Sequence, residues 1–413
     1  MSRRNSILIV FIVILLIIGG LLFFYFSSNN NASKNTTTNT NQTTTNPFGN
    51  TSSNKVSTTT NQTTTGNSQN LATTTNFAKL IKIYNNPTSG SVFFLNKNNQ
   101  SVERFVDRAT GNVYEYVPNT QTGEAIRITN TTIPKIQEAI WSSSGNNLVL
   151  RYLDNNTDNI SSFSGKVMSS SSLGEIVGSF LPSNVKQLAI DQVGNKIFEL
   201  IDKSDKSGTY GFTTNLDGSG KKLIFDSPIS YWNMSWPSEN IIALTTKPNY
   251  RDEGLLYFFN TQTYSLTRVL GNITGLSTVV NKDASLVAYS YSTNTSFSLN
   301  IYDAVNKISG NLSIATLADK CAWGNNNSKI LYCAIPQTIN PDNYPDTWYQ
   351  GLESFSDNIW KIDTVSGTMT EIYQVDSNEN TTIDAFDIKV SLDDKYLSFS
   401  NKNDLSLWLL NLN

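Results

Sequence analysis

The sequence predicts an all-β protein that folds as a seven-bladed β-propeller, and three observations lead to this prediction. An alternating strand, a short Ser/Gly/Asn turn and a second apolar strand make a hairpin at residues 138–152, EAIWSSSGNNLVLRY. Similar hairpins return along the chain with a period of about 45 residues, the length typical of one four-stranded blade. Their anchor residues include Trp141, Ile190, Trp236, Val280 and Trp323. The last hairpin, around Val390, begins a unit that is one strand short of a blade.

The predicted blades follow one another in chain order, each as an opening hairpin and two further strands. They cover residues 90–130, 136–181, 185–226, 232–270, 276–316 and 320–374. The seventh unit, residues 385–413, has only three strands, whereas a lone strand at residues 78–84 precedes the first blade. Pairing this lone strand with the last unit would close the ring and remove the free sheet edges of an open array. We therefore expect six complete blades and one blade shared between the two ends of the repeat region.

Three of the hairpin anchors are tryptophans, Trp141, Trp236 and Trp323. They recur at the blade spacing, where large aromatic side chains fill the gap between neighbouring sheets. We therefore expect these rings in the core and not in a cluster that stacks on a ligand.

The repeat resembles the TolB-type, WD40-like propeller repeats over residues 77–413. The resemblance is carried by hairpins such as AIWSSSGNNLVL and KVSLDDKYLSF and by strands such as FTTNLDGSGKKLIF. It implies a propeller that serves as a protein-interaction or ligand-binding platform in the cell envelope. The chain has neither the Trp-Asp dipeptide nor the Gly-His pair of true WD40 repeats, so nothing about WD40 partners follows.

The N-terminus predicts a single membrane span. Residues 7–26, ILIVFIVILLIIGGLLFFYF, contain no charge, and a helix of this length crosses about 30 Å of hydrocarbon. The run is longer than the core of a cleavable signal peptide and ends in bulky aromatic residues, which favours an uncleaved signal-anchor. Arg3 and Arg4 precede it, so residues 1–6 are expected in the cytoplasm and everything after residue 26 on the outer side of the cell membrane.

Residues 27–76 are almost entirely Asn, Thr, Ser and Gln. A stretch of this composition cannot bury enough apolar surface to offset its chain entropy, so we expect a disordered linker. It would tether the propeller domain, residues 77–413, to the lipid bilayer.

Charge and histidine content restrict the possible functions. The chain has 30 Lys and Arg against 33 Asp and Glu, and no basic block beyond Arg3 and Arg4, which argues against nucleic acid as a partner. It has no histidine, and so lacks the usual general base and the commonest transition-metal ligand. We therefore expect no catalytic, cofactor-binding or metal-binding residues, and a non-catalytic domain that binds an envelope protein or a glycan.

The alternative is a hydrolase without histidine, a glycosidase type that uses two carboxylates at the mouth of the channel. Acidic pairs such as Asp393 and Asp394, or Asp252 and Glu253, could supply them. Each pair falls in a predicted turn or loop, where acidic residues are ordinarily solvated.

Cys321 and Cys333 lie on the two strands of one hairpin, with the turn GNNNSK between them. If the turn centres near Asn327, the two residues face each other and can form a disulfide outside the cell. A register shift of one residue would place them on opposite faces as two thiols, and the sequence leaves both possibilities open. Two thiolates without histidine make a poor metal site.

One stretch interrupts the repeat, residues 336–358, PQTINPDNYPDTWYQGLESFSDN, between the second and third strands of the sixth blade. Long loops in compact domains are usually functional or disordered, and this one is rich in aromatic residues. It lies on the predicted face of the blade connections and the channel mouth. Either it forms a binding rim or it is a lid that covers its own blade. The corresponding loop of the fourth blade, KPNYRDEG, brings Tyr250 and Arg251 to the same face. The candidate rim residues are these two together with Tyr344, Trp348, Tyr349 and Phe355.

Overall fold

The computed structural model describes residues 79–118, 123–154, 159–168, 173–375 and 382–412. The expected cytoplasmic tail, membrane anchor and linker lie outside these residues. Within the described ranges, no helix is both long enough and apolar enough to span a membrane.

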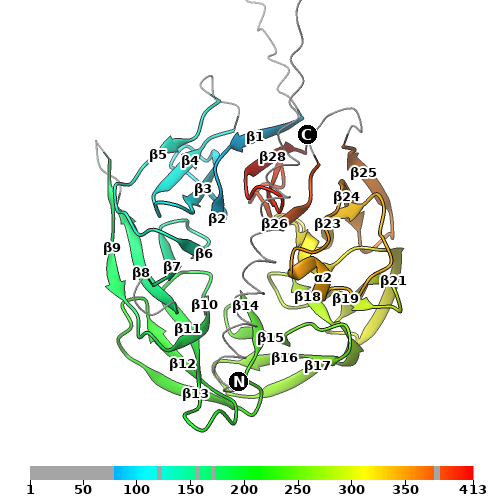
Figure 1. Ribbon diagram of the computed structural model, residues 1–413, viewed down its shortest axis with the longest axis horizontal. Coiled ribbons are helices and arrows are strands. Elements are labelled where there is room, and N and C mark those ends of the chain that lie inside the picture. The colour runs from blue at the N-terminus through cyan, green and yellow to red at the C-terminus, as the bar shows by residue number, and fades with distance from the viewer. Residues whose placement is uncertain (1–78, 119–122, 155–158, 169–172, 376–381, 413) are drawn as a thin grey trace, which may run out of the picture. The chain divides into compact units, whose positions relative to one another are not determined.

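Seven four-stranded antiparallel sheets stand around a central axis, as the sequence predicted (Figure 1). In six of these blades the four strands are consecutive in the chain, and the first strand of each lies nearest the axis. The first three blades are β2 (Thr88–Leu95), β3 (Ser101–Asp107), β4 (Val113–Tyr116), β5 (Ile126–Arg127); β6 (Ile136–Trp141), β7 (Asn147–Leu153), β8 (Ile160–Met168), β9 (Glu175–Phe180); and β10 (Val185–Ile190), β11 (Lys196–Asp202), β12 (Thr209–Asn215), β13 (Lys222–Ser227).

The next three blades repeat this arrangement, and the sixth is preceded by a single 3₁₀ turn, η1 (Ala318–Lys320). They are β14 (Trp232–Ser238), β15 (Ile241–Thr246), β16 (Glu253–Asn260), β17 (Leu266–Thr274); β18 (Ser277–Val280), β19 (Leu286–Ser292), β20 (Phe297–Asp303), β21 (Ile308–Ile314); and β22 (Cys321–Trp323), β23 (Ile330–Pro336), β24 (Asp357–Asp363), β25 (Met369–Tyr373). Residues between β23 and β24 hold one short helix, α2 (Asp346–Tyr349).

The seventh blade joins the two ends of the repeat region. Its strand order is β1-β28-β27-β26, with β1 at Leu80–Tyr84, β26 at Ala385–Val390, β27 at Tyr396–Asn401 and β28 at Leu407–Asn411. β1 pairs with β28 in antiparallel register, Leu80 opposite Leu410 and Ile81 opposite Leu409. The predicted closure of the ring by the lone first strand is therefore confirmed.

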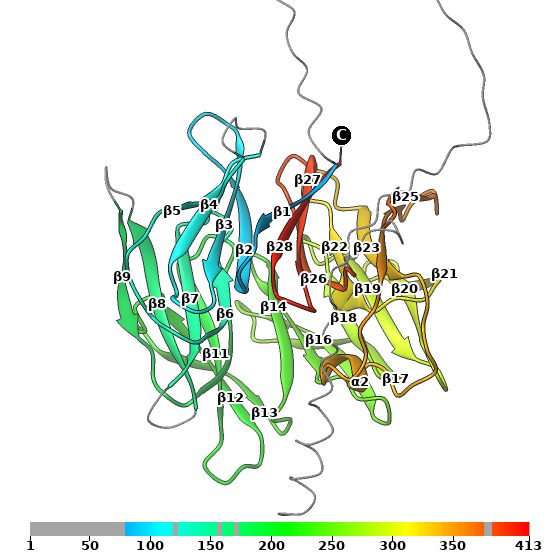
Figure 2. The same ribbon diagram turned by 45° about the horizontal axis from the view of Figure 1, so that its top comes forward.

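The ring has two distinct ends. The turns between first and second strands and between third and fourth strands lie at one end, which we call the turn end. The loops between second and third strands and the connections between blades lie at the other, which we call the insert end because it carries residues 337–356. Figure 2 shows α2 and the C-terminus at opposite ends of the ring.

The hydrophobic core lies between neighbouring sheets, and the repeated tryptophans belong to it. Trp236 and Trp323 are each 8% exposed, whereas Trp141 is half-buried. Trp141 Nε1 donates to the carbonyl of Gly90, 3.3 Å away, and Trp323 Nε1 donates to the carbonyl of Val279, 3.0 Å away. These two indoles each tie a blade to the preceding one, which confirms a structural role for Trp141 and Trp323, but Trp141 and Trp236 also line a central cavity.

The two cysteines lie directly opposite each other on β22 and β23 and form a disulfide. Their Cα atoms are 4.1 Å apart, and both residues are buried. Of the two possibilities that the sequence left open, the structure contains the bridged one.

Candidate functional site

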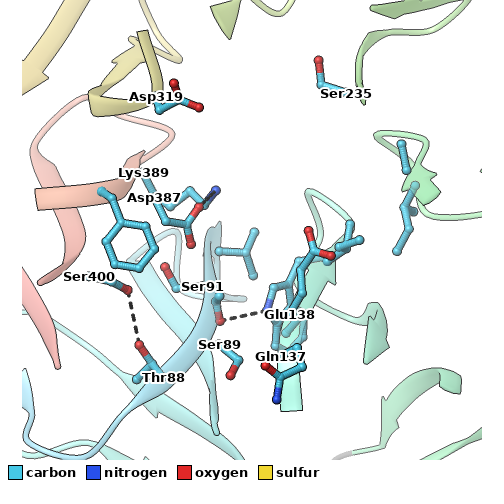
Figure 3. Close-up of a pocket in the computed structure, with 18 of the residues that line it drawn as sticks. Thr88, Ser89, Ser91, Gln137, Glu138, Ser235, Asp319, Asp387, Lys389 and Ser400 are labelled. Atoms are coloured by element: carbon cyan, nitrogen blue, oxygen red, sulfur yellow. Dashed lines mark hydrogen bonds and ion pairs between the residues drawn. The ribbon is translucent and has the colours of Figure 1, made fainter. Parts of the chain in front are cut away.

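A cavity of about 760 Å³ lies at the centre of the ring (Figure 3). Its wall is built from the first strands of blades 1, 2, 3, 4 and 7, together with η1 and α2. Aromatic side chains and charged side chains both contribute to it. They include Trp141, Trp236, Trp348, Tyr349 and Phe386 on the one hand, and Arg108, Glu138, Asp319, Asp387, Lys389 and Lys402 on the other.

A second cavity, of about 400 Å³, adjoins the first and reaches turn-end residues such as Lys282 and Asn325. The two cavities share Asp319, Asp387 and Lys389. These three charged groups therefore lie where the two parts of the channel meet.

Asp387 and Lys389 reach the channel from an irregular stretch of β26. The register with β27 shifts between Phe386 and Lys389, and Asp387 has a positive φ of 49°. This bulge brings both side chains to one side, where Lys389 Nζ lies 2.6 Å from Asp387 Oδ1. Enclosure by protein lowers the pKa of Lys389, but the charge and hydrogen bond of Asp387, with Glu138 and Glu103, raise it above its ordinary value. The ammonium therefore stays charged.

Glu138 lies across the cavity from this pair (Figure 3). It follows a register shift in β6, and its Oε2 is 3.5 Å from Arg151 Nη1. Enclosure within the channel raises the pKa of Glu138, although its side chain is 54% exposed to the cavity; Arg151 opposes the rise and the charge of Asp387 adds to it. The channel thus holds two carboxyl groups, each with a cationic partner: Glu138 with Arg151, and Asp387 with Lys389.

A further carboxyl group lies behind the channel wall. Glu103 on β3 is fully buried, and among the described residues neither of its side-chain oxygens has a hydrogen-bond partner. Burial raises its pKa to about 8, and the neighbouring Ser398 and Ser91 lower it only in part. Glu103 is therefore mostly protonated at neutral pH.

Asp319 and Tyr349 form the part of the wall that connects η1 to α2. The Tyr349 hydroxyl donates to Asp319 Oδ2 over 2.8 Å, and Ser277 Oγ donates to the same oxygen. Burial of the phenol and the charge of Asp319 raise the pKa of Tyr349 well above its ordinary value. The phenol therefore remains a donor, and the ring, 37% exposed, lies at the edge of the cavity.

The insert is fastened to the ring by a buried ionic centre. Lys320, Asp357 and Asp384 are all fully buried, with Lys320 Nζ 2.8 Å from Asp357 Oδ2 and 2.5 Å from Asp384 Oδ1. Asp384 also accepts hydrogen bonds from Trp348 Nε1, at 3.0 and 3.1 Å, and from the backbone N–H of Phe355, at 3.1 Å. Burial raises the pKa of Asp357 to about 6, and Lys320 offsets part of this rise. The centre therefore joins η1, β24 and the start of blade 7 to both sides of the insert.

The structure corrects part of the predicted binding rim. Tyr344, Trp348 and Phe355 are 1%, 3% and 3% exposed, and they pack with Phe297 and Leu317 in one cluster. Of the three, only Trp348 is among the residues that line the cavity. The reason is that the insert packs against residues of the neighbouring blades, such as Phe297 and Phe386, and so buries these rings.

The other three candidate residues lie nearer the surface. Tyr349 lines the cavity, Tyr250 is half-buried and Arg251 is exposed. The backbone N–H of Tyr250 donates to Asp346 Oδ2 over 2.7 Å, so the corresponding loop of blade 4 contacts the helix of the insert. Tyr250 and Arg251 are not among the residues that line the cavity.

Sequence reasoning did not single out the charged residues of the channel. Glu138, Asp387 and Lys389 all belong to hairpins that defined the repeat, EAIWSSS and DIKVSLDD. Because the first strand of each blade borders the channel, polar residues on these strands were the available signal.

Asp394, one of the acidic residues considered for a hydrolase, has a structural role. Its carboxylate accepts hydrogen bonds from the backbone N–H groups of Asn325, at 2.7 Å, and Asn327, at 3.0 Å, and so connects two neighbouring blades. Within the described ranges, no three Asp, Glu or Cys side chains converge as metal ligands.

No protein-family model matches the chain, and no curated protein matches its sequence. Solved structures do resemble it. The tricorn protease has 11% identical residues and a TM-score of 0.51, with 81% of this chain and 34% of the protease covered. An oligogalacturonate lyase in complex with manganese has 12% identity and a TM-score of 0.49, with 81% and 98% covered.

TolB from Acinetobacter baumannii has 10% identity and a TM-score of 0.43, with 68% of this chain and 62% of TolB covered. The chain thus spans less than two thirds of TolB and about one third of the protease. At these identities the likeness concerns the fold alone. The seven four-stranded sheets, closed into a ring by the pairing of β1 with β28, make the chain a seven-bladed β-propeller.

Proposed function

We propose that this chain is a membrane-tethered, extracytoplasmic propeller that binds a protein segment or a glycan in its central cavity without catalysing a reaction. The observation that carries the proposal is the cavity itself. Its volume of about 760 Å³ lies within the range of about 300–1,000 Å³ common for ligand sites. Its wall combines aromatic rings with a few charged groups of both signs, a combination that suits the apolar faces and the polar groups of either ligand.

Two observations support the extracytoplasmic location. Arg3 and Arg4 precede the uncharged run at residues 7–26, and Cys321 and Cys333 form a disulfide, a bond that persists mainly in oxidising compartments. In intact cells, protease added outside should therefore remove the propeller from the membrane fraction. Cleavage only after the cells are opened would overturn this part of the proposal.

The binding site is tested by capture from solubilised envelope extracts with the full-length chain. Tyr349→Ala removes an aromatic face and a hydrogen-bond donor from the cavity wall. If Tyr349 is a binding hot spot, its loss costs about 1.4 kcal/mol or more of binding free energy, so capture should weaken at least about tenfold. Tyr210→Ala is the matched control, because Tyr210 is 36% exposed but lies on β12, away from the cavity. Equal capture by the two variants would remove the cavity from the proposal.

A carboxylate hydrolase is the second candidate, and one observation favours it. Glu138 has a raised pKa and lines the same cavity as Asp387, so two carboxyl groups share one site, as a glycosidase of this type requires. The test is the release of reducing ends from a panel of envelope glycans by the wild type and by Glu138→Gln. Release that the variant loses would replace the non-catalytic proposal with this one.

A further inference from the structure

Exposed apolar side chains are distributed unequally over the two ends of the ring. Of the nineteen large hydrophobic side chains that are exposed among the described residues, fourteen lie at the turn end or in the adjoining halves of the strands. All seven blades contribute at least one of them. The most exposed are Val305 (73%), Val365 (71%), Val193 (66%), Ile308 (64%) and Ile126 (61%).

The insert end differs in number and in kind. Its exposed hydrophobic residues are Phe180, Tyr210, Tyr231, Tyr349 and Leu352, four of them aromatic. The aliphatic side chains at the turn tips are largely exposed and contribute little to the core of the ring. Singly, such side chains are ordinary on a protein surface, but here they concentrate at one end of the ring. This asymmetry indicates that the turn end contacts something apolar.

The turn-end residues form separate tips and not a groove. Val305 and Ile308 come from the hairpin between β20 and β21, and Val365 comes from the equivalent hairpin between β24 and β25. Charged residues of both signs accompany them: Lys307 precedes Ile308, and Asp303 and Asp363 each lie two residues before an exposed valine. Short aliphatic side chains among charges of both signs, spread around a ring, fit a broad and deformable surface with an apolar interior and a charged boundary, as a lipid bilayer has.

The chain enters the propeller at this same end. Leu80, the first residue of β1, pairs with Leu410 near the end of β28, and the carbonyl of Lys79 accepts the backbone N–H of Asn411 at 2.8 Å. The 78 preceding residues, with the uncharged run at residues 7–26, therefore join the ring at the turn end.

We propose that the turn end of the propeller lies against the lipid bilayer, with the aliphatic tips in the boundary between headgroups and acyl chains. The inference rests on the proposed function, since it takes the tether for granted. Docking in this orientation turns the insert end, with Tyr349 and α2, away from the membrane. The binding cavity would then open toward partners in the extracytoplasmic space.

The test uses the full-length chain in vesicles of phosphatidylcholine and phosphatidylglycerol, with and without doxyl-labelled lipids. Val305→Cys and Leu352→Cys are labelled with an environment-sensitive fluorophore, because these residues are 73% and 71% exposed but lie at opposite ends. The native cysteines are bridged and do not compete for the label. We expect doxyl lipids to quench the label at residue 305 at least about twofold more than the label at residue 352.

A second pair of variants checks that the aliphatic tips cause the contact. Val193→Asp with Val365→Asp should reduce the lipid quenching of the label at residue 305 at least about twofold, since each inserted carboxylate opposes burial at an anionic surface. Unchanged quenching in this background would overturn the role of the tips.

Flotation of the same vesicles separates this inference from the proposed function. If the chain does not float with lipid, the tether fails and the docking fails with it. If it floats but the two labels are quenched equally, the tether stands and the docking is overturned. If the label at residue 305 is shielded from an aqueous quencher in detergent without lipid, a second copy of the chain covers the turn end, and the docking is likewise overturned.

Discussion

Removal of the charge at Lys320 should unfasten the insert and destabilise the propeller. In Lys320→Met, the fully buried carboxylates of Asp357 and Asp384 lose their only cation within 4 Å among the described residues, while Trp348 and Phe355 remain hydrogen-bonded to Asp384. Breaking a buried ion pair in this way costs about 3–5 kcal/mol, since it leaves uncompensated charge in a site without water. At an unfolding entropy of about 2.1 cal/mol/K per residue, a domain of this size should melt roughly 4–7 °C lower.

The size of this loss should depend on pH. The pKa of Asp357 is raised to about 6 in the folded protein, above its ordinary value of 3.8. Its contribution to stability is therefore complete below about pH 4 and is lost as the pH rises through 6. Lys320 lowers the pKa of Asp357, so in Lys320→Met the folded pKa of Asp357 rises further. The loss of stability with rising pH therefore extends to a higher pH in the variant than in the wild type. The difference between the two proteins should be larger at pH 8 than at pH 4.5.

Urea unfolding followed by circular dichroism at pH 4.5 and pH 8 measures both effects. Lys402→Met is the matched control, because Lys402 Nζ lies 5.3 Å from the centre of the Trp348 ring but forms no ion pair within 4 Å among the described residues. We expect the control to lose less than about 1 kcal/mol. A loss below about 1 kcal/mol for Lys320→Met at pH 8, or the same loss at both pH values, would refute the reasoning.

Three further predictions concern the closure, the disulfide and a buried acid. A chain that begins at residue 90, and so lacks β1, should melt well below one that begins at residue 70; equal melting would mean that β1 does not close the ring. Intact mass after alkylation in denaturant should show no label on Cys321 or Cys333 without reductant and two labels with it. Glu103→Gln should remove a pH dependence of stability. The pKa of Glu103 is about 8 in the folded protein, above its ordinary value of 4.5, so folding favours the protonated form. As the pH rises from 4.5 past 8, the wild type should therefore lose up to roughly 4–5 kcal/mol of unfolding free energy relative to the variant. Parallel stability curves for the two proteins between these pH values would contradict the burial of Glu103.

The fold was predictable because its information is local and repeated. Each blade carries its own alternating strands and polar turns, so the period and the missing last strand were readable without any contact between distant residues. The pairing of β1 with β28 joins the two ends of the repeat region, yet it too followed from the count, since an open ring would expose two sheet edges. The membrane span and the linker rest on composition alone and remain predictions.

The site depended on tertiary structure. Glu138 and Asp387 are far apart in sequence, and only the closed ring brings them to one cavity, where enclosure shifts the pKa of Glu138. The aromatic insert was visible in the sequence, but whether its rings face solvent or core depended on Lys320, Asp357 and Asp384. These three residues come from separate segments and look like ordinary surface charges until they meet. Composition can show that a loop is rich in aromatic rings, but the direction in which the rings point is decided by the buried partners that only the folded chain supplies.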